Sequence, residues 1–172
     1  FVHGGAQERK RRAGTENVTG IIGLGAAVKR AAATMEERMK KESELRDYLI
    51  GRVMEEIPYC RLNGHKTDRL PNNANLSFRF VEGESLLIML DGKGICASSG
   101  SACTSGSLDP SHVLLAIGLP HEIAHGSLRM TLSDETTKEE IDYVVDCLKE
   151  IVATLRNMSP LYEDFLKKEK SK

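Results

Sequence analysis

The hydrophobic positions follow helical spacing at both ends of the chain and strand spacing in the middle. In the first third, apolar residues recur every three or four positions, which predicts helix on either side of a charged stretch at 35–43. Thr15 offers an N-cap oxygen at the start, and Pro58 ends the pattern. The pattern leaves open whether this region is one bent helix or two. Its apolar positions are Val18, Ile21, Ile22, Val28, Leu45, Leu49, Val53 and Ile57.

The middle of the chain has short runs in which apolar and polar residues alternate. Alternation places residues i and i+2 on one face, as in a half-buried strand. Leu128 and Met130 share a face in this way, while Arg129 points to the other. The expected strands are 60–62, 75–80, 94–97 and 127–132, and the expected short helices are 85–90 and 110–117.

A long amphipathic helix is predicted near the C-terminus. Thr136 and Glu139 form a capping box at its start. Its apolar stripe consists of Ile141, Val144, Val145, Leu148, Ile151, Val152 and Leu155. The strands and helices mix without regular βα alternation, and no repeat is visible. The expected fold class is therefore α/β, or more narrowly an α+β small domain with a small antiparallel or mixed sheet covered by helices.

Composition narrows the functional classes. The chain has 172 residues, 40% hydrophobic and 28% charged, with a net charge of −1. These values are typical of one globular domain and give no global field that favours nucleic acid or an anionic membrane. No apolar run approaches the ~20 residues that span a bilayer, and the start is not a signal peptide. We expect a cytoplasmic protein with no membrane or direct nucleic-acid partner. Because the chain begins at Phe1 without an initiator Met, we expect a piece of a longer polypeptide.

The cysteines differ in their sequence surroundings. Cys147 lies in the apolar helix, and Cys60 and Cys96 lie in or beside expected strands, so a structural role is expected for all three. Cys103 instead lies in a run of small polar residues at 98–107, which predicts a mobile, exposed loop. An exposed thiol on such a loop suits a nucleophile that visits two places.

Two other groups of residues carry side chains that could bind a ligand or a metal ion. Arg129 could hold a carboxylate with two parallel hydrogen bonds, although an arginine on a strand is usually solvated or salt-bridged. His112, His121 and His125 could bind zinc together with Cys103, but no second cysteine lies at metal-site spacing, so no metal is expected. The basic run at 9–12 has no interleaved aromatic residues and is read as a solvated or interface patch.

Several motifs, in order along nearly the whole chain, resemble the group I cysteine desulfurases of the NifS/IscS type. Residues 98–114, SSGSACTSGSLDPSHVL, resemble the active-site loop of that family. Residues 7–9 and 12–17, QER and RAGTEN, resemble its loop for the cofactor phosphate. Further similar segments are 70–73 (LPNN), 75–78 (NLSF), 81–86 (VEGESL) and 125–132 (HGSLRMTL).

The resemblance implies a fold-type I pyridoxal-phosphate enzyme of the class V aminotransferase family, working as a homodimer. Such an enzyme removes sulfur from L-cysteine, leaves L-alanine and forms a cysteine persulfide, with the cofactor as electron sink. It implies Cys103 as the nucleophile, Arg129 as the substrate-carboxylate residue and Thr15 as a phosphate contact across the dimer. The sulfur acceptor would be a protein such as an iron–sulfur scaffold or a tRNA-thiolation relay. The residues choose neither between these acceptors nor between cysteine and selenocysteine.

The resemblance also implies that the chain is a C-terminal portion. Residues 1–30 would end the large cofactor-binding domain and include a connecting helix, 31–166 would form the small domain, and 167–172 a disordered tail. The Schiff-base lysine is expected outside this chain, because Lys66 follows His65 in what the family has as a surface loop. Alone, the chain would be inactive. The alternative function is a non-catalytic sulfur-carrier or redox-thiol domain that uses Cys103.

Overall fold

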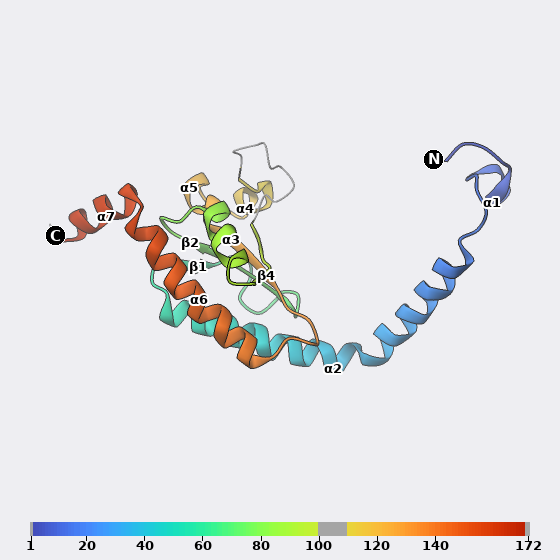
Figure 1. Ribbon diagram of the computed structural model, residues 1–172, viewed down its shortest axis with the longest axis horizontal. Helices are drawn as coiled ribbons and strands as arrows, with labels where there is room; N and C mark the ends of the chain where they lie inside the picture. The colour runs from blue at the N-terminus through green and yellow to red at the C-terminus, as the bar shows by residue number, and fades with distance from the viewer. Residues whose placement is uncertain (1, 100–109, 171–172) are drawn as a thin grey trace. The chain divides into compact units, whose positions relative to one another are not determined.

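The computed structural model describes residues 2–99 and 110–170 (Figure 1). The chain divides into two compact units, Phe1–Glu37 and Arg38–Lys172. The helix α2 (Val18–Glu56) begins in the first unit and ends in the second, so the two apolar stretches seen in the sequence belong to one helix. We expected the domain boundary at residue 30, and that functional boundary stays a prediction.

The first unit contains the short helix α1 (Gln7–Lys10) and the beginning of α2. The N-cap of α2 is Asn17, whose Oδ1 accepts a hydrogen bond from the Gly20 N–H at 3.0 Å. The expectation that Thr15 caps this helix was wrong, because the helix begins at Val18 and the cap is the residue directly before it. The apolar residues expected on one face of this first stretch are exposed within the unit: Val18, Ile21, Ile22 and Val28.

The second unit is built around a small antiparallel sheet. In the described residues it has four strands in the order β1-β2-β4-β3, and every neighbouring pair is antiparallel. This confirms the predicted fold class. The strands are β1 (Cys60–Leu62), β2 (Asn73–Phe78), β3 (Ser98–Ser99) and β4 (Ser127–Thr131).

The expectation of a strand at 94–97 was wrong. That segment closes the helix α3 (Gly83–Asp91) instead. The N–H groups of Lys93 and Ile95 both donate to the Leu90 carbonyl, and Gly94 adopts a positive φ of 75°. Because their N–H groups are used in this turn, strand pairing starts only at Ser98.

One face of the sheet packs against helices to form the core. The alternating side chains of β2 and β4 on this face are buried: Ala74, Leu76, Phe78, Leu128 and Met130. They contact α3, the second half of α2 and the long helix α6 (Lys138–Asn157), which lies alongside α2 (Figure 1). Leu148 and Val53 are fully buried in this core. The predicted apolar faces of both long helices are therefore used in the second unit.

The start of α6 differs from the prediction by one residue. The capping box is formed by Thr137 and Glu140, not by Thr136 and Glu139. The Thr136 hydroxyl is engaged in the preceding turn, where it accepts a hydrogen bond from the Ser133 N–H at 3.0 Å. The segment Thr136–Thr137 therefore has two capping hydroxyls, of which only the second serves the helix.

The last described element is α7 (Pro160–Lys170), so residues 167–170 are helical rather than disordered as expected. Two aromatic side chains of α7, Tyr162 and Phe165, pack edge-on against Tyr59. Phe80, two residues after β2, contacts the same two rings. This aromatic cluster attaches α7 to the sheet.

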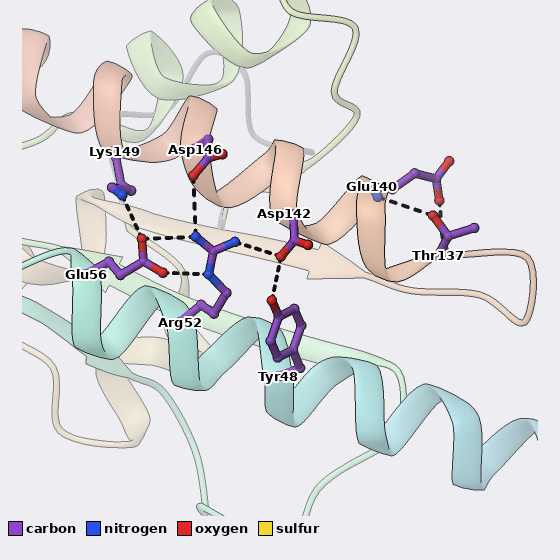
Figure 2. A network of polar contacts seen from close by, with 8 residues as sticks. All are labelled: Tyr48, Arg52, Glu56, Thr137, Glu140, Asp142, Asp146 and Lys149. Carbon is purple, nitrogen blue, oxygen red and sulfur yellow. Dashed lines mark hydrogen bonds and ion pairs between the residues drawn. The ribbon is translucent and has the colours of Figure 1, made fainter.

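A network of charged side chains joins the second half of α2 to α6 (Figure 2). Arg52 pairs with Glu56 on its own helix at 2.5 Å and with Asp142 on α6 at 2.7 Å. Lys149 of α6 reaches Glu56 at 2.7 Å. The hydrogen bonds from Arg52 and Lys149 lower the pKa of Glu56 to about 2, so this carboxyl stays ionised well into the acidic range.

The short helices α4 (His112–Ala116) and α5 (His121–His125) precede β4. Leu114, Leu119 and Ala124 form a small second hydrophobic cluster between them. No helix in the described parts of the chain is long and apolar enough to cross a membrane.

Candidate active site

The second face of the sheet is polar and carries the predicted carboxylate-binding residue. Arg129 lies in the middle of β4, and its neighbours Leu128 and Met130 are buried on the opposite face. Strand alternation therefore directs the exposed Arg129 side chain to the polar face. Its cross-strand partners are Asn75 on β2 and Ser98 on β3. These residues form a row across three strands.

The guanidinium of Arg129 has no acidic partner within residues 2–99 and 110–170. Its Nη2 donates to the Ser98 Oγ at 3.3 Å. The Ser98 hydroxyl in turn donates to the carbonyl of Ser99 at 3.2 Å. Among the described residues, the positive charge of Arg129 therefore has no carboxylate partner, whereas Arg52 has several. An arginine in this state can bind an anionic group without first breaking an ion pair.

Tight backbone packing fixes the start of β4. The Phe78 N–H donates to the Gly126 carbonyl at 2.8 Å. A Cβ at Gly126 would lie 2.2 Å from the Phe78 carbonyl oxygen, and one at Gly83 would lie 2.7 Å from the His125 carbonyl oxygen. Both approaches are too close for any side chain. The two glycines therefore set the position of β4, and Arg129 with it, relative to β2 and α3.

The polar face continues into a buried cluster of amides and a hydroxyl. Asn63, directly after β1, is only 3% exposed. Its Nδ2 donates to the Asn75 Oδ1 at 2.7 Å and to the Ser77 Oγ at 2.8 Å. The Asn63 N–H also donates to the Asn75 carbonyl at 2.9 Å. This cluster was not predicted from the sequence. Alternation along β2 could have placed Asn75 on the polar face, but no local pattern indicates Asn63.

Cys103, the predicted nucleophile, lies outside the described residues. In the sequence it follows β3, whose Ser98 and Ser99 pair with Arg129 and Leu128. The strand that leads into the segment with Cys103 is therefore the strand that contacts Arg129.

The other cysteines have distinct surroundings. Cys147 is buried in the core. Cys60 is half-buried, and this burial raises the pKa of its thiol. These two fit a structural role, whereas Cys96 is exposed and lies outside any strand, contrary to the expectation for it. Within the described residues, no group of three or more His, Cys, Asp or Glu side chains is placed to hold a metal ion.

Thr15 lies in the first unit, apart from the sheet residues in sequence. Its side chain is exposed, and its hydroxyl has no hydrogen-bond partner in the described part of the chain. Nearby, Arg12 pairs with Glu16 at 2.5 Å and donates to the Gly14 carbonyl at 2.7 Å. The free hydroxyl beside this basic loop fits a contact with a phosphate group.

Lys66 lies in the turn between β1 and β2 and is exposed. The preceding His65 accepts hydrogen bonds through its Nδ1 from the N–H groups of Thr67 and Asp68, at 3.3 and 2.8 Å. These bonds organise a surface turn around Lys66. They do not place its ammonium next to Arg129 or Ser98.

The comparisons with known proteins identify the family. The model for the aminotransferase class-V family matches residues 3–144. The chain belongs to this family. Cysteine desulfurase IscS of Methanosarcina thermophila is 59% identical over 94% of this chain and 40% of its own length. Cysteine desulfurase IscS of Clostridium botulinum (strain Hall) is 54% identical over the whole chain and 44% of its own length.

Solved structures agree with this assignment. A NifS-like protein superposes with a TM-score of 0.76 at 33% identity, over 90% of this chain and 38% of its own. A NifS-like protein from Rickettsia africae superposes with a TM-score of 0.76 at 30% identity, over 88% of this chain and 39% of its own. The chain thus spans less than half the length of these family members.

Proposed function

We propose that this class-V chain is the C-terminal portion of a pyridoxal-phosphate-dependent cysteine desulfurase. The enzyme takes the sulfur from L-cysteine, releases L-alanine and passes the sulfur to an acceptor protein. The observation that carries the proposal is the position of Arg129. Its side chain lies on the open polar face of the sheet without an acidic partner among the described residues, next to the strand that leads to Cys103.

Arg129 binds the carboxylate of L-cysteine in this proposal. Its guanidinium can present two parallel N–H groups to two carboxylate oxygens, which fixes the orientation of the substrate as well as its position. The bond to Ser98 Oγ uses Nη2 in the absence of substrate and is weaker than a bond to an anion. Substrate binding can therefore displace it.

Cys103 receives the sulfur. Its thiolate attacks the substrate sulfur and forms an S–S bond, while the bond between that sulfur and the substrate Cβ breaks. The electron pair of the broken bond goes to Cβ, which takes up a proton and becomes the methyl group of alanine. The products are one L-alanine and one persulfide on Cys103, so no external oxidant is required. Two equivalents of a thiol reductant then release sulfide and regenerate the Cys103 thiol.

Pyridoxal phosphate, when bound, supplies the electron sink that makes the substrate Cβ–S bond breakable. The Thr15 hydroxyl forms a hydrogen bond with the phosphate of the cofactor. That cofactor is held mainly by the partner subunit of a homodimer. This role is supported by the exposed Thr15 hydroxyl, which has no hydrogen-bond partner in the parts of the chain that the structure describes. The Schiff-base lysine lies outside the present chain, and Lys66 in its surface turn has no part in the site.

The sulfur acceptor is a protein such as an iron–sulfur scaffold, and the enzyme acts in the cytoplasm. The names of the curated relatives support a desulfurase over the sulfur-carrier alternative considered from the sequence.

The test is production of alanine and sulfide from L-cysteine by the complete protein with pyridoxal phosphate and a thiol reductant. The expected result is equal amounts of the two products, lost in the Cys103→Ser variant. The Cys147→Ser variant is the matched control, because that thiol is buried in the core. The proposal would be refuted if the wild-type protein produced neither alanine nor sulfide, or if the Cys103→Ser variant were fully active.

A further inference from the structure

We infer that Met54 and Cys60 form a two-sulfur site for a soft monovalent metal ion, and that Cu(I) is the ion that fits it. The inference goes beyond the proposed desulfurase activity and does not depend on it. It assigns a ligand to two side chains at the junction of α2 and β1, which the motif resemblance leaves without a role.

The two sulfur atoms lie next to each other although they come from different elements. Met54 lies in the last turn of α2, and Cys60 is the first residue of β1. The Cys60 Sγ lies 3.7 Å from the Met54 Sδ. Because metal–sulfur bonds are about 2.3 Å long, one ion can bond to both sulfur atoms at this separation in a bent arrangement.

The type of ligand selects the metal. A thiolate and a thioether are soft ligands, and such ligands select Cu(I) among the biological metal ions. Zinc instead takes four ligands from cysteine, histidine and carboxylate side chains. Within residues 2–99 and 110–170, no three or more His, Cys, Asp or Glu side chains are grouped to hold an ion. The pair Met54–Cys60 therefore lacks the ligands that zinc requires.

The charge balance also favours a monovalent ion. The Cys60 thiolate carries one negative charge and the Met54 thioether carries none, so a monovalent ion gives a neutral site. The guanidinium of Arg156 is 4% exposed and donates to the carbonyl of Tyr59, the residue before Cys60, at 3.3 Å. A divalent ion would leave a positive charge in a half-buried position near this buried cation, which is unfavourable.

The carbonyl groups at the end of α2 surround the Cys60 sulfur. The thiol donates to the Ile57 carbonyl at 3.0 Å, and the Sγ lies 3.6 Å from the Val53 carbonyl oxygen. Carbonyl groups at a helix C-terminus carry partial negative charge and stabilise a cation placed beside them. A metal ion that replaces the thiol proton therefore lies in a favourable field.

Metal binding exchanges one cation for another on the Cys60 sulfur. The S–H bond breaks, the proton goes to the solvent, and the electron pair of the thiolate forms the bond to Cu(I). The Met54 sulfur adds a lone pair as the second ligand. Neither copper nor sulfur changes its oxidation state, so the step requires no oxidant and no reductant.

The experiment measures the affinity of the complete protein for Cu(I), without oxygen, by competition with the chelator bathocuproine disulfonate. The background carries Cys96→Ser and Cys103→Ser, which removes two other thiols of this chain. In this background, Cys60→Ser should lose one equivalent of bound Cu(I). Met54→Leu should weaken the binding of that equivalent by more than about tenfold, because a direct ligand contributes at least as much as the groups that orient it.

Each variant has a matched control. Met39→Leu changes a methionine on the same helix that is 46% exposed, against 44% for Met54, and Cys147→Ser changes a thiol buried in the core. Both controls should leave the affinity for Cu(I) unchanged within about twofold. Zn(II), titrated in the same way, should bind equally to the background protein and to Cys60→Ser.

Alkylation gives a second measurement that needs no substitution of Cys60. One equivalent of Cu(I) should slow the reaction of the Cys60 thiol with iodoacetamide, followed by mass spectrometry, and Met54→Leu should remove this protection. The inference is overturned if Cys60→Ser keeps the bound equivalent, if Met54→Leu and Met39→Leu have the same affinity, or if Cu(I) gives Cys60 no protection. Zn(II) binding that is lost in Cys60→Ser would overturn the choice of a monovalent ion.

Discussion

The Arg52 guanidinium on α2 donates to the Asp142 Oδ1 on α6 at 2.7 Å, and the same oxygen accepts from the Tyr48 hydroxyl at 2.6 Å (Figure 2). The bond from Tyr48, together with that from Arg52, lowers the pKa of the Asp142 carboxyl. The pKa of Tyr48 is raised in turn, chiefly by its bond to Asp142. Two helices from distant parts of the sequence are thus joined by a carboxylate with two donors.

Replacing Arg52 with Met should lower the urea midpoint of the second unit. The change leaves the carboxylates of Glu56 and Asp142 without their shared cation, and only Lys149 remains to compensate Glu56. The control is Lys93→Met, which removes a more exposed and longer pair with Glu150 at 3.7 Å. That change should alter stability by less than about 0.5 kcal/mol. Equal effects of the two variants would contradict the assigned role of Arg52.

The pH dependence of stability should reveal the contribution of the ionised Glu56 carboxylate. Its pKa is lowered to about 2 from the ordinary 4.5, so its ionised form contributes stability that is complete above the unfolded value. That contribution is lost as pH falls from about 4.5 through about 2. The difference in unfolding free energy between wild type and Glu56→Gln should therefore be constant at neutral pH and shrink in this acidic window. A difference that does not change with pH would show that Glu56 is not paired in solution.

Replacing Gly126 with Ala should destabilise the sheet by about 2–3 kcal/mol, because the added Cβ meets a backbone oxygen 2.2 Å away rather than a movable side chain. Displacement of β4 should also raise the KM for L-cysteine. Gly51→Ala is the control: Gly51 is a helix position with no atom within 4 Å of the added Cβ. It should stabilise the protein by up to about 1 kcal/mol in urea denaturation.

Replacing Arg129 with Lys should lower kcat/KM for L-cysteine about 30-fold, because the ammonium retains the charge but not the two parallel N–H groups. This corresponds to about 2 kcal/mol of lost binding. Arg61→Lys, an exposed arginine on β1 opposite Ser77, should have no such effect. Steady-state kinetics of the complete protein provide the measurement. An unchanged kcat/KM in Arg129→Lys would remove the carboxylate role.

Thr15 and Asn17 should separate into different roles. Asn17→Ala removes the cap of α2 and should cost about 1 kcal/mol of helix stability. Thr15→Ala should leave the helix intact but weaken retention of pyridoxal phosphate, measured by equilibrium dialysis of the complete protein. The opposite pattern would restore Thr15 as the cap.

Elements with long or strict periodicity were predictable from the sequence. Leu76 and Phe78 on β2 and Leu128 and Met130 on β4 are buried as their alternation indicated. The cap of α6 was misplaced because Thr136-Thr137 followed by Glu139-Glu140 allows the same capping pattern in two registers. Local sequence cannot distinguish them; the hydrogen bond from Ser133 to Thr136 decides.

The candidate site was predictable only where motif or alternation indicated it. Arg129 was found because its neighbours had to be buried. The pairing of Arg129 with Ser98 and Asn75 depends on strand order and register, which no local pattern contains. Asn63 lies outside every strand, and its role follows from the pairing of β1 with β2.

The burial of Asn63 has a consequence for the chemical ageing of the protein. Asn63 precedes Gly64, and asparagine before glycine is prone to deamidation, because glycine leaves the following backbone nitrogen unhindered. Here the Asn63 amide is buried and donates to two neighbours, which hinders that ring closure. Deamidation at this position would therefore record local opening of the β1–β2 turn. Once formed, the new carboxylate would face the Asn75 oxygen in a buried position, so an aged molecule would keep its β1–β2 turn open more often.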